Sequence, residues 1–423
     1  MTAGAACCRP FQMSVKLAVV GGGAAGMFAA VHAADADGGA EVTLFERGDR
    51  LGLKLGITGK GRCNLTNNCP PDEFLRSVPT NSRFLYSAIN NFTPADTMAY
   101  FESLGVPLKT ERGGRVFPVS DKASDIVNAL RREVGRKCRV IRERVTDITV
   151  VDGAVAGLRT ASGAYQFDRV IIATGGLSYK ATGSDGDGLR IAERLGLAVT
   201  PPKPSLVPLE TVEDWCAEAM GLSLKNTGLK VIDTTTNKTV YDDFGELLFT
   251  HFGVSGPMIL SASAYLPEVT PERYKITLDL KPALDMAALD ARILSDFSKY
   301  KNRDFGNALS DLLPLKLIPV IIKLSGIEAH RKVNSITKAE RGTLVSLLKG
   351  LCCTVKRTRP IDEAIITSGG VNVTELNPRT MECRKIKGLY FAGEVIDVDA
   401  YTGGFNLQIA FSTGRAAGID AAR

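Results

Sequence analysis

Three glycines and one acidic residue near the start of the chain have the types and the spacing that bind a dinucleotide. Gly21, Gly23 and Gly26 lie in one short turn, which apolar residues 17–20 precede. In such a turn the first glycine permits a tight bend, the second lets a pyrophosphate approach the backbone, and the third lets a helix meet a strand. Glu46 follows Gly26 by 20 residues, where an acidic side chain accepts hydrogen bonds from an adenosine ribose.

The elements around this turn are those that must hold it. Residues 17–20 are a short apolar run typical of a buried parallel strand, residues 41–45 are predicted to form a second strand, and residues 24–36 suit a helix packed closely on a sheet. The free N–H groups of Ala24 and Ala25, in the first helical turn, would point at the phosphates. The sequence therefore predicts an α/β fold with a Rossmann-type nucleotide domain.

A second stretch, residues 47–67, interleaves glycines with lysines and arginines. It makes a poor helix or strand, but its backbone suits a path along phosphates and a ring system, so we interpret it as the second wall of the nucleotide site. A basic surface loop is the alternative. The candidate cofactor-binding residues of this stretch are Arg47, Lys54, Gly59, Arg62, Cys63 and Asn64.

Cys63 and Cys69 have five residues between them and raise the alternative of a redox pair. Such pairs normally have a tighter spacing fixed by a helix, and they need a base that forms the thiolate. We therefore expect Cys63 to be a packed or cofactor-facing thiol. The nine cysteines of the chain include no CxxC pair and no Cys/His spacing typical of zinc, so no metal is expected.

Two later segments place more glycines directly after apolar runs. Residues 169–172 are predicted to form a buried strand that leads into Ala173, Thr174 and Gly175, a further backbone segment for the cofactor. Residues 388–392 form another such run, and a helix begins soon after it. The candidate cofactor-binding residues of that last segment are Gly393, Glu394, Asp397, Gly403, Gly404, Phe405, Asn406 and Leu407.

Capping residues locate several elements of the scaffold. Thr93 and Thr337 are each predicted to be the N-cap of a helix, and Ser120 is predicted to cap a helix as well. Asp187 lies in the glycine-rich segment GSDGDG, which no strand precedes. We therefore expect it to cap the helix 188–195 rather than to belong to a second dinucleotide turn.

Prolines at 201, 202 and 204 mark a change of composition, and we place a domain boundary there. The expected nucleotide domain is discontinuous, residues 13–200 and 361–423, and an inserted domain of mixed β and α structure occupies 201–360. The β part of the inserted domain is expected at about 205–260 and 325–360, and its helical part at about 284–324.

The composition is that of a soluble globular protein, with 44% hydrophobic and 23% charged residues among 423. The 52 Lys and Arg against 46 Asp and Glu give a net charge of +6 with both signs interspersed, so no nucleic-acid partner is expected. No run of about 18 apolar residues occurs, so no membrane-spanning helix is expected. We expect reduced thiols and a cytoplasmic location, with Met13 as an alternative start.

Six motifs in order along the chain resemble the flavoprotein family that includes aminoacetone oxidases and dehydro-bile-acid reductases. One residue departs from the pattern: Lys180 stands where a proline is expected after the tyrosine, which changes the loop locally and leaves the cofactor site intact. The motifs are GGGAAG at 21–26, GITGKGRCNLTN at 56–67, RVFPVSDKASDIV at 115–127, ATGGLSYKATGSDGDG at 173–188, FTHFGVSGP at 249–257 and the segment 366–418.

The resemblance implies an FAD-dependent oxidoreductase with a two-dinucleotide-binding-type Rossmann FAD domain and the inserted domain. By this resemblance, Glu46 matches the adenosine-ribose acid, residues 56–64 line the flavin, and Val145 contacts adenine through its backbone. Glu394 or Asp397 would bind the ribityl hydroxyls.

Hydride transfer is flavin chemistry, for which the protein supplies binding, orientation and electrostatics. We expect a reductase of a small enone-like substrate. NAD(P)H would visit the flavin face as a transient donor, since the chain has no second nucleotide fingerprint. The candidate proton donors are Tyr179, His251 and Tyr401. The alternatives are an amine oxidase that uses oxygen, an RNA-modifying flavoprotein and a flavin-binding protein without turnover, and the oligomeric state is open.

Overall fold

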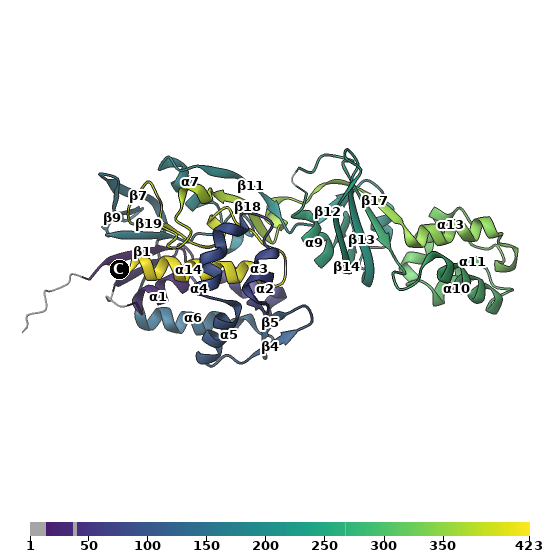
Figure 1. The fold of residues 1–423 in the computed structure, drawn as a ribbon, viewed down its shortest axis with the longest axis horizontal. Helices are drawn as coiled ribbons and strands as arrows, with labels where there is room; N and C mark the ends of the chain where they lie inside the picture. Colours follow the sequence, from purple (N-terminus) through teal and green to yellow (C-terminus); the bar gives the residue numbers. More distant parts are fainter. Residues whose placement is uncertain (1–13, 37–39, 267) are drawn as a thin grey trace, which may run out of the picture. The chain divides into compact units, whose positions relative to one another are not determined.

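The computed structural model describes residues 14–36, 40–266 and 268–423, which divide into two compact units (Figure 1). Unit 1 combines the chain up to Lys203 with the chain from Thr367 onward, and unit 2 is the segment Pro204–Ile366 between them. Each unit has a hydrophobic core of its own. Unit 2 is therefore inserted into the sequence of unit 1.

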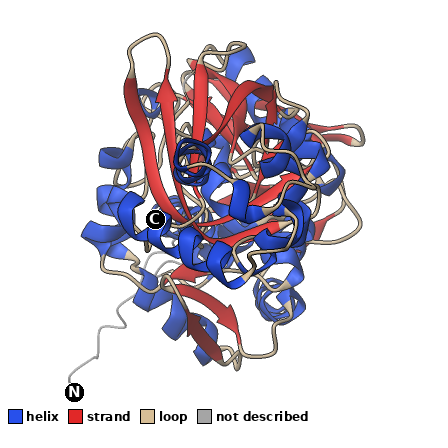
Figure 2. Ribbon diagram, turned by 90° about the vertical axis from the view of Figure 1, so that its right-hand side faces the viewer, coloured by secondary structure: helices blue, strands red, loops and turns tan. Residues whose placement is uncertain are grey.

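A five-stranded parallel sheet in the order β19-β10-β1-β2-β6 forms the centre of unit 1. Figure 2 colours the strands of the described chain red and the helices blue. The strands are β1 (Lys16–Val20), β2 (Glu41–Phe45), β6 (Arg139–Ile141), β10 (Arg169–Ile172) and β19 (Leu389–Phe391). In register, Val20 lies opposite both Phe45 and Ile172. The carboxyl ends of the three central strands therefore meet at one edge of the sheet, where their glycine segments begin.

Helices and three smaller sheets complete unit 1. The helices are α1 (Ala24–Ala34), α2 (Leu53–Gly61), α3 (Pro71–Arg76), α4 (Tyr86–Asn91), α5 (Pro94–Ser103), α6 (Ala123–Lys137), α7 (Asp187–Arg194) and α14 (Phe405–Ala421). The small sheets comprise β3 (Thr66–Asn67), β5 (Arg115–Pro118) and β4 (Leu108–Glu111); β7 (Val145–Val151), β8 (Ala154–Thr160) and β9 (Gly163–Gln166); and β11 (Val199–Ser205) with β18 (Ile366–Val371).

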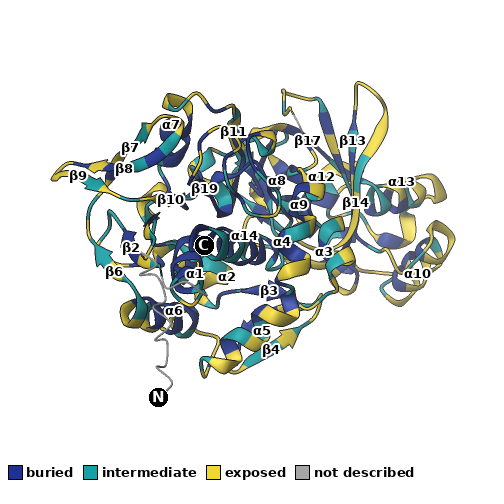
Figure 3. Cartoon of the chain, turned by 60° about the vertical axis from the view of Figure 1, so that its left-hand side comes forward, coloured by how far each residue is buried: buried dark blue, intermediate teal, exposed yellow. Residues whose placement is uncertain are grey.

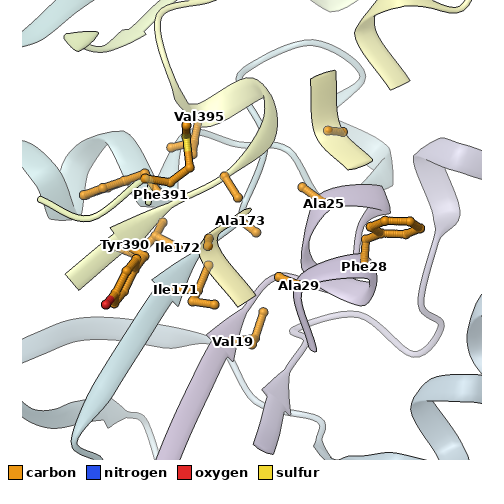
Figure 4. Packing of buried hydrophobic residues seen from close by; sticks show 14 of the residues in the cluster. Val19, Ala25, Phe28, Ala29, Ile171, Ile172, Ala173, Tyr390, Phe391 and Val395 are labelled. Atoms are coloured by element: carbon orange, nitrogen blue, oxygen red, sulfur yellow. The ribbon is translucent and has the colours of Figure 1, made fainter. Parts of the chain in front are cut away.

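Helices α1 and α14 pack backbone to backbone beside the sheet. Figure 4 labels Ala25 and Ala29 of α1 among the buried residues of this core. A Cβ atom added to Gly414 would lie 2.5 Å from the carbonyl oxygen of Ala25, and one added to Gly418 would lie 2.3 Å from that of Ala29. No larger side chain fits between the helices at these two points. The small residues of both helices thus fix the position of α1, whose first turn follows the glycine turn.

A closed antiparallel barrel forms one part of unit 2, and a group of helices forms the other. The strands, in barrel order, are β12 (Leu209–Thr211), β15 (Gly253–Ser255), β14 (Lys238–Thr250), β13 (Ser223–Asp233), β16 (Tyr274–Asp279) and β17 (Leu351–Thr358). The helices of unit 2 are α8 (Trp215–Glu218), α9 (Pro257–Ser263), α10 (Met286–Lys299), α11 (Phe305–Ala308), α12 (Ile318–Ser325) and α13 (Lys338–Lys349). Among the described residues of both units, no helix has the length and apolar character needed to cross a membrane.

The units divide after Lys203 and after Ile366, where the sequence led us to expect 200/201 and 360/361. The proline-rich segment is not a linker, because it forms strand β11, and the fixed φ of proline suits a strand in a two-stranded sheet. The β structure expected at 325–360 is present only as β17, because helix α13 precedes that strand. Thr337 is the N-cap of α13, as predicted, and forms a capping box with Glu340.

Of the four predicted helix caps, Thr93 and Thr337 are confirmed, and Ser120 and Asp187 are wrong. Helix α6 begins after Lys122, and Ser120 instead donates a hydrogen bond to Asp125 at 2.6 Å. Helix α7 begins after Gly186, which has a φ of 83°, so Asp187 lies in the first turn. Glycine takes the cap position there because it tolerates the left-handed backbone. Thr93 caps α5 in a capping box, as predicted.

His32 on α1 predicts a loss of stability in mild acid. Burial lowers its pKa to about 4, against the hydrogen bond that its ring donates to the carbonyl oxygen of Phe28 at 2.9 Å. In the unfolded chain the pKa is about 6.5, so the unfolded state binds more protons between these values. We expect this residue to remove roughly 3 kcal/mol from the free energy of unfolding between pH 7.5 and pH 4. Urea unfolding at both pH values tests this, since His32→Phe should lose that part of the pH dependence; an unchanged dependence would contradict it.

Candidate functional site

The glycine turn after β1 is shaped by close backbone contacts at two glycines and is open at the third. A Cβ on Gly21, whose φ is 107°, would lie 2.5 Å from the carbonyl oxygen of Ala173, and one on Gly26 would lie 1.8 Å from that of Gly21. No atom of the described chain lies within 4 Å of a Cβ built on Gly23. No side chain caps α1, which starts there. The turn therefore leaves space and unpaired N–H groups for an anion at Gly23.

Glu46 is fixed at the end of β2 by two backbone groups. Its carboxylate accepts hydrogen bonds from the N–H of Gly22 and from the N–H of Gly48, both at 2.8 Å. Each oxygen keeps a further lone pair for a ribose hydroxyl. The carboxylate lies at a cavity of about 330 Å³, a size within the range of small-molecule sites. The cavity is lined by Glu46, Arg47, Gly48, Leu53, Arg144, Ala181, Thr182 and Gly183.

Arg47 and Arg144 at this cavity are tied to the segment that starts α7. Arg47 forms a salt bridge with Asp185, and Arg144 contacts Asp185 at 2.9 Å and Asp187 at 2.6 Å. Although burial opposes ionisation, hydrogen bonds from Arg144 and Arg190 hold the pKa of Asp187 below its usual range. The GSDGDG segment, which sequence reasoning used only for a helix cap, therefore closes one side of the cavity.

The basic glycine-rich stretch 47–67 was expected to form neither helix nor strand. That expectation is wrong in part, because the stretch contains helix α2. The helix is interrupted at residues 58–60, whose backbone is non-helical, and a Cβ on Gly59 would lie 3.0 Å from the backbone nitrogen of Asn64. Cys63 then donates its N–H to the carbonyl oxygen of Thr58 at 2.9 Å. Glycines at the break let the chain reverse tightly. This turn places Asn64 inside the unit.

A half-buried polar cluster joins four segments that are far apart in sequence. The ammonium group of Lys54 on α2 donates to Glu394 at 2.6 Å and to the hydroxyl of Ser178 at 2.7 Å. The other carboxylate oxygen of Glu394 accepts from Ser178 at 3.0 Å and from the N–H of Thr367 at 2.9 Å. The hydroxyl of Thr367 in turn accepts from the N–H of Leu177 at 2.7 Å. This Lys54 cluster holds four segments together: α2, the segment after β10, β18 and the segment after β19.

The segment after β19 closes on the glycine turn and on β3. A Cβ on Gly393 would lie 2.7 Å from the Cβ of Ala25, and one on Gly404 would lie 2.2 Å from the carbonyl oxygen of Thr66. Asn406 holds its own loop, because its amide exchanges hydrogen bonds with the backbone of Ala400 at 2.7 and 2.9 Å. No side chain caps α14, so the N–H groups of its first turn have no side-chain acceptor at the cap.

The HI0933-like protein Rossmann domain family matches residues 15–420. The chain belongs to this family. It is 31% identical to the 3-dehydro-bile acid delta(4,6)-reductase of Clostridium scindens over 410 residues, which cover 96% of this chain and 99% of that protein. It is 32% identical to the ribosomal RNA dihydrouridine synthase of Escherichia coli over 404 residues, which cover 95% of this chain and 96% of that protein.

Two solved structures have the same fold as this HI0933-like protein. The 3-ketosteroid delta1-dehydrogenase of Sterolibacterium denitrificans is 14% identical, with a TM-score of 0.51, over 96% of this chain and 99% of that one. The quinol fumarate reductase of E. coli is 18% identical, with a TM-score of 0.51, over 96% of this chain and 70% of that one. At these identities the likeness concerns the fold alone.

The residues of this HI0933-like chain fit FAD. The backbone is open over Gly23, and two buried polar atoms, Asn64 Oδ1 and Thr174 Oγ1, have no hydrogen-bond partner within the described chain. Buried polar atoms are normally paired, so both point to a polar group that the chain itself does not supply. With the family membership, this makes the protein an FAD-dependent oxidoreductase. In the described residues no three His, Cys, Asp or Glu side chains are grouped to hold a metal ion.

Three further predicted site residues of the HI0933-like chain have no described contact with the glycine turn or the Lys54 cluster. Arg62 lies at the surface, where it pairs with Glu111 and Asp121. The carboxylate of Asp397 is buried and accepts a hydrogen bond from Thr200 at 2.8 Å. Val145 starts β7. Their roles at the cofactor therefore remain predictions.

Gly175, Gly403, Phe405 and Leu407 lie in the segments that border this site. A Cβ on Gly175, whose φ is 75°, would lie 2.7 Å from the hydroxyl oxygen of Ser184. Gly403 has a φ of 126° and accepts a hydrogen bond from Asn67 through its carbonyl. Phe405 is buried and Leu407 is half-buried in the first turn of α14. The cofactor roles predicted for these residues also remain predictions.

Two of the three candidate proton donors lie in unit 1. Tyr179 is half-buried with a φ of 52°, and a short 3-10 helix that begins at Lys180 follows it. Tyr401 is half-buried in the loop that Asn406 closes. His251 belongs to unit 2, where it is exposed in the turn between β14 and β15. The described contacts leave all three as candidates.

The structure adds two residues that sequence reasoning missed, Ser178 and Thr367. Both contribute to the Lys54 cluster, and the hydroxyl of Thr367 also accepts from the N–H of Ser178 at 3.2 Å. The only sequence signal was their place beside predicted glycine segments, in ATGGLS and ITSGG. A serine or threonine next to such a segment therefore merits inclusion among site candidates.

The thiols near the site are expected to be unreactive, which argues against the redox-pair alternative. Burial raises the pKa of Cys63 to about 12 and that of Cys69 to about 11. At pH 8 we expect Cys63 to be alkylated on the order of a thousandfold more slowly than free cysteine, because so little thiolate is present. Mass spectrometry of iodoacetamide-treated protein measures this. Rapid labelling, or loss of flavin reduction in Cys63→Ser, would contradict it.

Proposed function

We propose that this protein uses FAD to reduce a carbon–carbon double bond conjugated to a carbonyl group, with NAD(P)H as the electron donor. The similarity to the bile acid reductase over almost the full length of both chains carries the proposal. The name of that relative describes reduction of double bonds in a dehydro-bile acid. A small enone-like molecule is the substrate class that this comparison favours.

The chain supplies binding and orientation, whereas bound FAD supplies hydride transfer. The turn at Gly23 would hold the pyrophosphate, and Glu46 would hold the adenosine ribose, since its position at the end of β2 is fixed by two N–H groups. Asn64 and Thr174 offer unpaired oxygens to cofactor donors. The Lys54 cluster would hold the carboxylate of Glu394 in a fixed orientation.

Reduction of such a double bond also needs a proton at the carbon next to the carbonyl. Tyr179 and Tyr401 are the donors that we propose in unit 1, and His251 is the candidate from unit 2. Tyr401→Phe and Tyr179→Phe should each be tested for a loss of about 100-fold in the rate of substrate reduction with unchanged reduction of the flavin. A proton donor is identified when its substitution slows reduction of the substrate and leaves reduction of the flavin unchanged.

Uridine in RNA is a second candidate substrate. The relatives in E. coli and in Haemophilus influenzae, 32% and 31% identical, are both named ribosomal RNA dihydrouridine synthase. The double bond that such an enzyme reduces is conjugated to a carbonyl of the base, so the chemistry is the same as for an enone. The expectation of no nucleic-acid partner is therefore open, and the substrate must be found by experiment.

In the experiment, the holoprotein is first reduced with NADPH in the absence of oxygen. A steroid enone and a uridine-containing ribosomal RNA fragment are then added in separate reactions. We expect one product to gain two hydrogens, detected by mass spectrometry, while the flavin is reoxidised. Reoxidation only by oxygen, after reduction by an amine, would favour the amine oxidase alternative. A flavin that neither donor nor acceptor changes would favour a binding protein without turnover.

A further inference from the structure

A dense run of positive charge lies on α6 and β6. Residues 131–142 contain six lysines and arginines and one glutamate. The run covers the end of α6 and continues into β6, the edge strand of the parallel sheet, at the surface of unit 1 (Figure 3). The proposed function assigns no role to these residues.

Three arginines of this surface converge on one turn. Arg131 donates through Nε to the carbonyl oxygen of Leu51 at 3.0 Å, and Arg142 donates through Nη1 to the carbonyl oxygen of Gly48 at 3.3 Å. Arg50 precedes Leu51 in the same turn. Burial lowers the pKa of Arg131, and the charges of Arg50 and Arg142 lower it further, as expected for neighbouring guanidinium groups.

No carboxylate balances these three charges. Within the described part of the chain none of the three arginines forms a salt bridge, whereas nearby Arg136 and Lys137 pair with Glu133 at 3.0 and 2.8 Å. Asp49 lies in the same turn but is exposed and has no salt bridge among the described residues. Guanidinium groups kept together without a counter-charge match the oxygens of a phosphate group, which they bind in a fork geometry.

We propose that Arg50, Arg131 and Arg142 bind a phosphate ester carried by an incoming reactant. This inference rests on the proposed function, whose candidate reactants both carry such groups: NADPH as donor and RNA as the second candidate substrate. The cluster borders the cavity at Glu46, since the carbonyl that holds Arg142 belongs to the lining residue Gly48. The turn that carries Arg50 also contacts the glycine turn, because Gly52 donates its N–H to the carbonyl oxygen of Gly22 at 2.8 Å.

The test uses the full-length holoprotein with Arg50→Gln and Arg142→Gln together. Arg131 is kept, because its half-buried side chain holds the carbonyl of Leu51. The matched control is Arg83→Gln with Arg379→Gln, which removes the same charge from two exposed arginines of unit 1. One arm measures the dissociation constants of NADPH and NADH from anaerobic flavin reduction, and the other measures binding of a uridine-rich single-stranded RNA across a salt series.

We expect about a tenfold or larger loss of affinity in one arm for the cluster variant and none for the control. Weaker binding of NADPH but not of NADH would assign the site to the 2′-phosphate of the donor. Weaker binding of RNA, with a salt slope reduced by about 1.4, would assign it to the nucleic-acid backbone. An equal loss in the control, no loss in either arm, no binding of either ligand by the wild type, or a loss of FAD affinity would overturn the proposal.

These outcomes separate the site from the function. If the arginines bind RNA but the holoprotein reduces no conjugated substrate, the proposed function is wrong and the phosphate site stands. If NADPH-fed reduction proceeds and neither affinity depends on the arginines, the phosphate site alone is wrong.

Discussion

Gly26→Ala is expected to yield a protein that is less stable by about 3 kcal/mol and that retains no FAD. The added Cβ would lie 1.8 Å from the carbonyl oxygen of Gly21, which belongs to the backbone and has no free rotation to relieve the clash. Helix α1 must then move away from β1, and α14 packs against α1 through Gly414 and Gly418. The free energy of unfolding of the apoprotein in urea, with the flavin content after purification, measures both effects.

Gly23→Ala is the matched control, three residues earlier in the same turn. Its φ of −79° and ψ of −169° suit alanine, and the new Cβ would meet no atom of the described chain within 4 Å. We expect the apoprotein to keep its stability within about 0.5 kcal/mol and FAD affinity to fall at least about tenfold, since the methyl group occupies the space meant for phosphate. Unchanged FAD affinity in Gly23→Ala would contradict the location of the pyrophosphate.

Removing Lys54 is expected to have the second largest effect. In Lys54→Met the carboxylate of Glu394 keeps its hydrogen bonds from the Ser178 hydroxyl and the Thr367 N–H. It loses its counter-charge in a half-buried position. We expect the free energy of unfolding of the apoprotein to fall by about 1–3 kcal/mol, below the range for fully buried pairs because about a fifth of each side chain stays exposed. Bound FAD should dissociate faster, because the cluster joins the segments expected to border it.

A double-mutant cycle tests whether the pair itself is responsible. With Glu394→Gln added to Lys54→Met, we expect a coupling of about 1–2 kcal/mol in urea unfolding. The exposed pair Lys299 and Asp311, whose charged atoms lie 2.9 Å apart, provides the control. Its cycle should give a coupling of no more than about 0.5 kcal/mol. Equal couplings in the two cycles would contradict a special role for the Lys54 cluster.

The sequence predicted those parts of the fold that depend on local patterns. The predicted strands at residues 17–20 and 41–45 form β1 and β2, and the glycine turn after β1 has the close contacts expected at Gly21 and Gly26. These features depend on a few neighbouring residues and on the period of the apolar side chains. The distance from the turn to Glu46 follows from the length of one helix, so the candidate ribose acid could be predicted as well.

Features that depend on distant contacts were not predicted. Ser178 and Thr367 are far apart in sequence, and only the packing of β10 and β18 segments brings them to Lys54. Helix α2 forms within a glycine-rich stretch, and its helical backbone is interrupted at residues 58–60. The composition of the whole stretch does not indicate so short a helix. The absence of a salt bridge at Arg131 among the described residues could likewise not be predicted, because it depends on which acidic side chains lie nearby in the fold.

The most direct test of FAD-dependent reduction is an anaerobic titration of the purified protein followed by its absorbance spectrum. We expect a flavin band that bleaches with one equivalent of NADPH or NADH per FAD and returns with one equivalent of a conjugated enone or of uridine in RNA. A protein that carries no flavin band, even after reconstitution with FAD, would contradict the account at its centre.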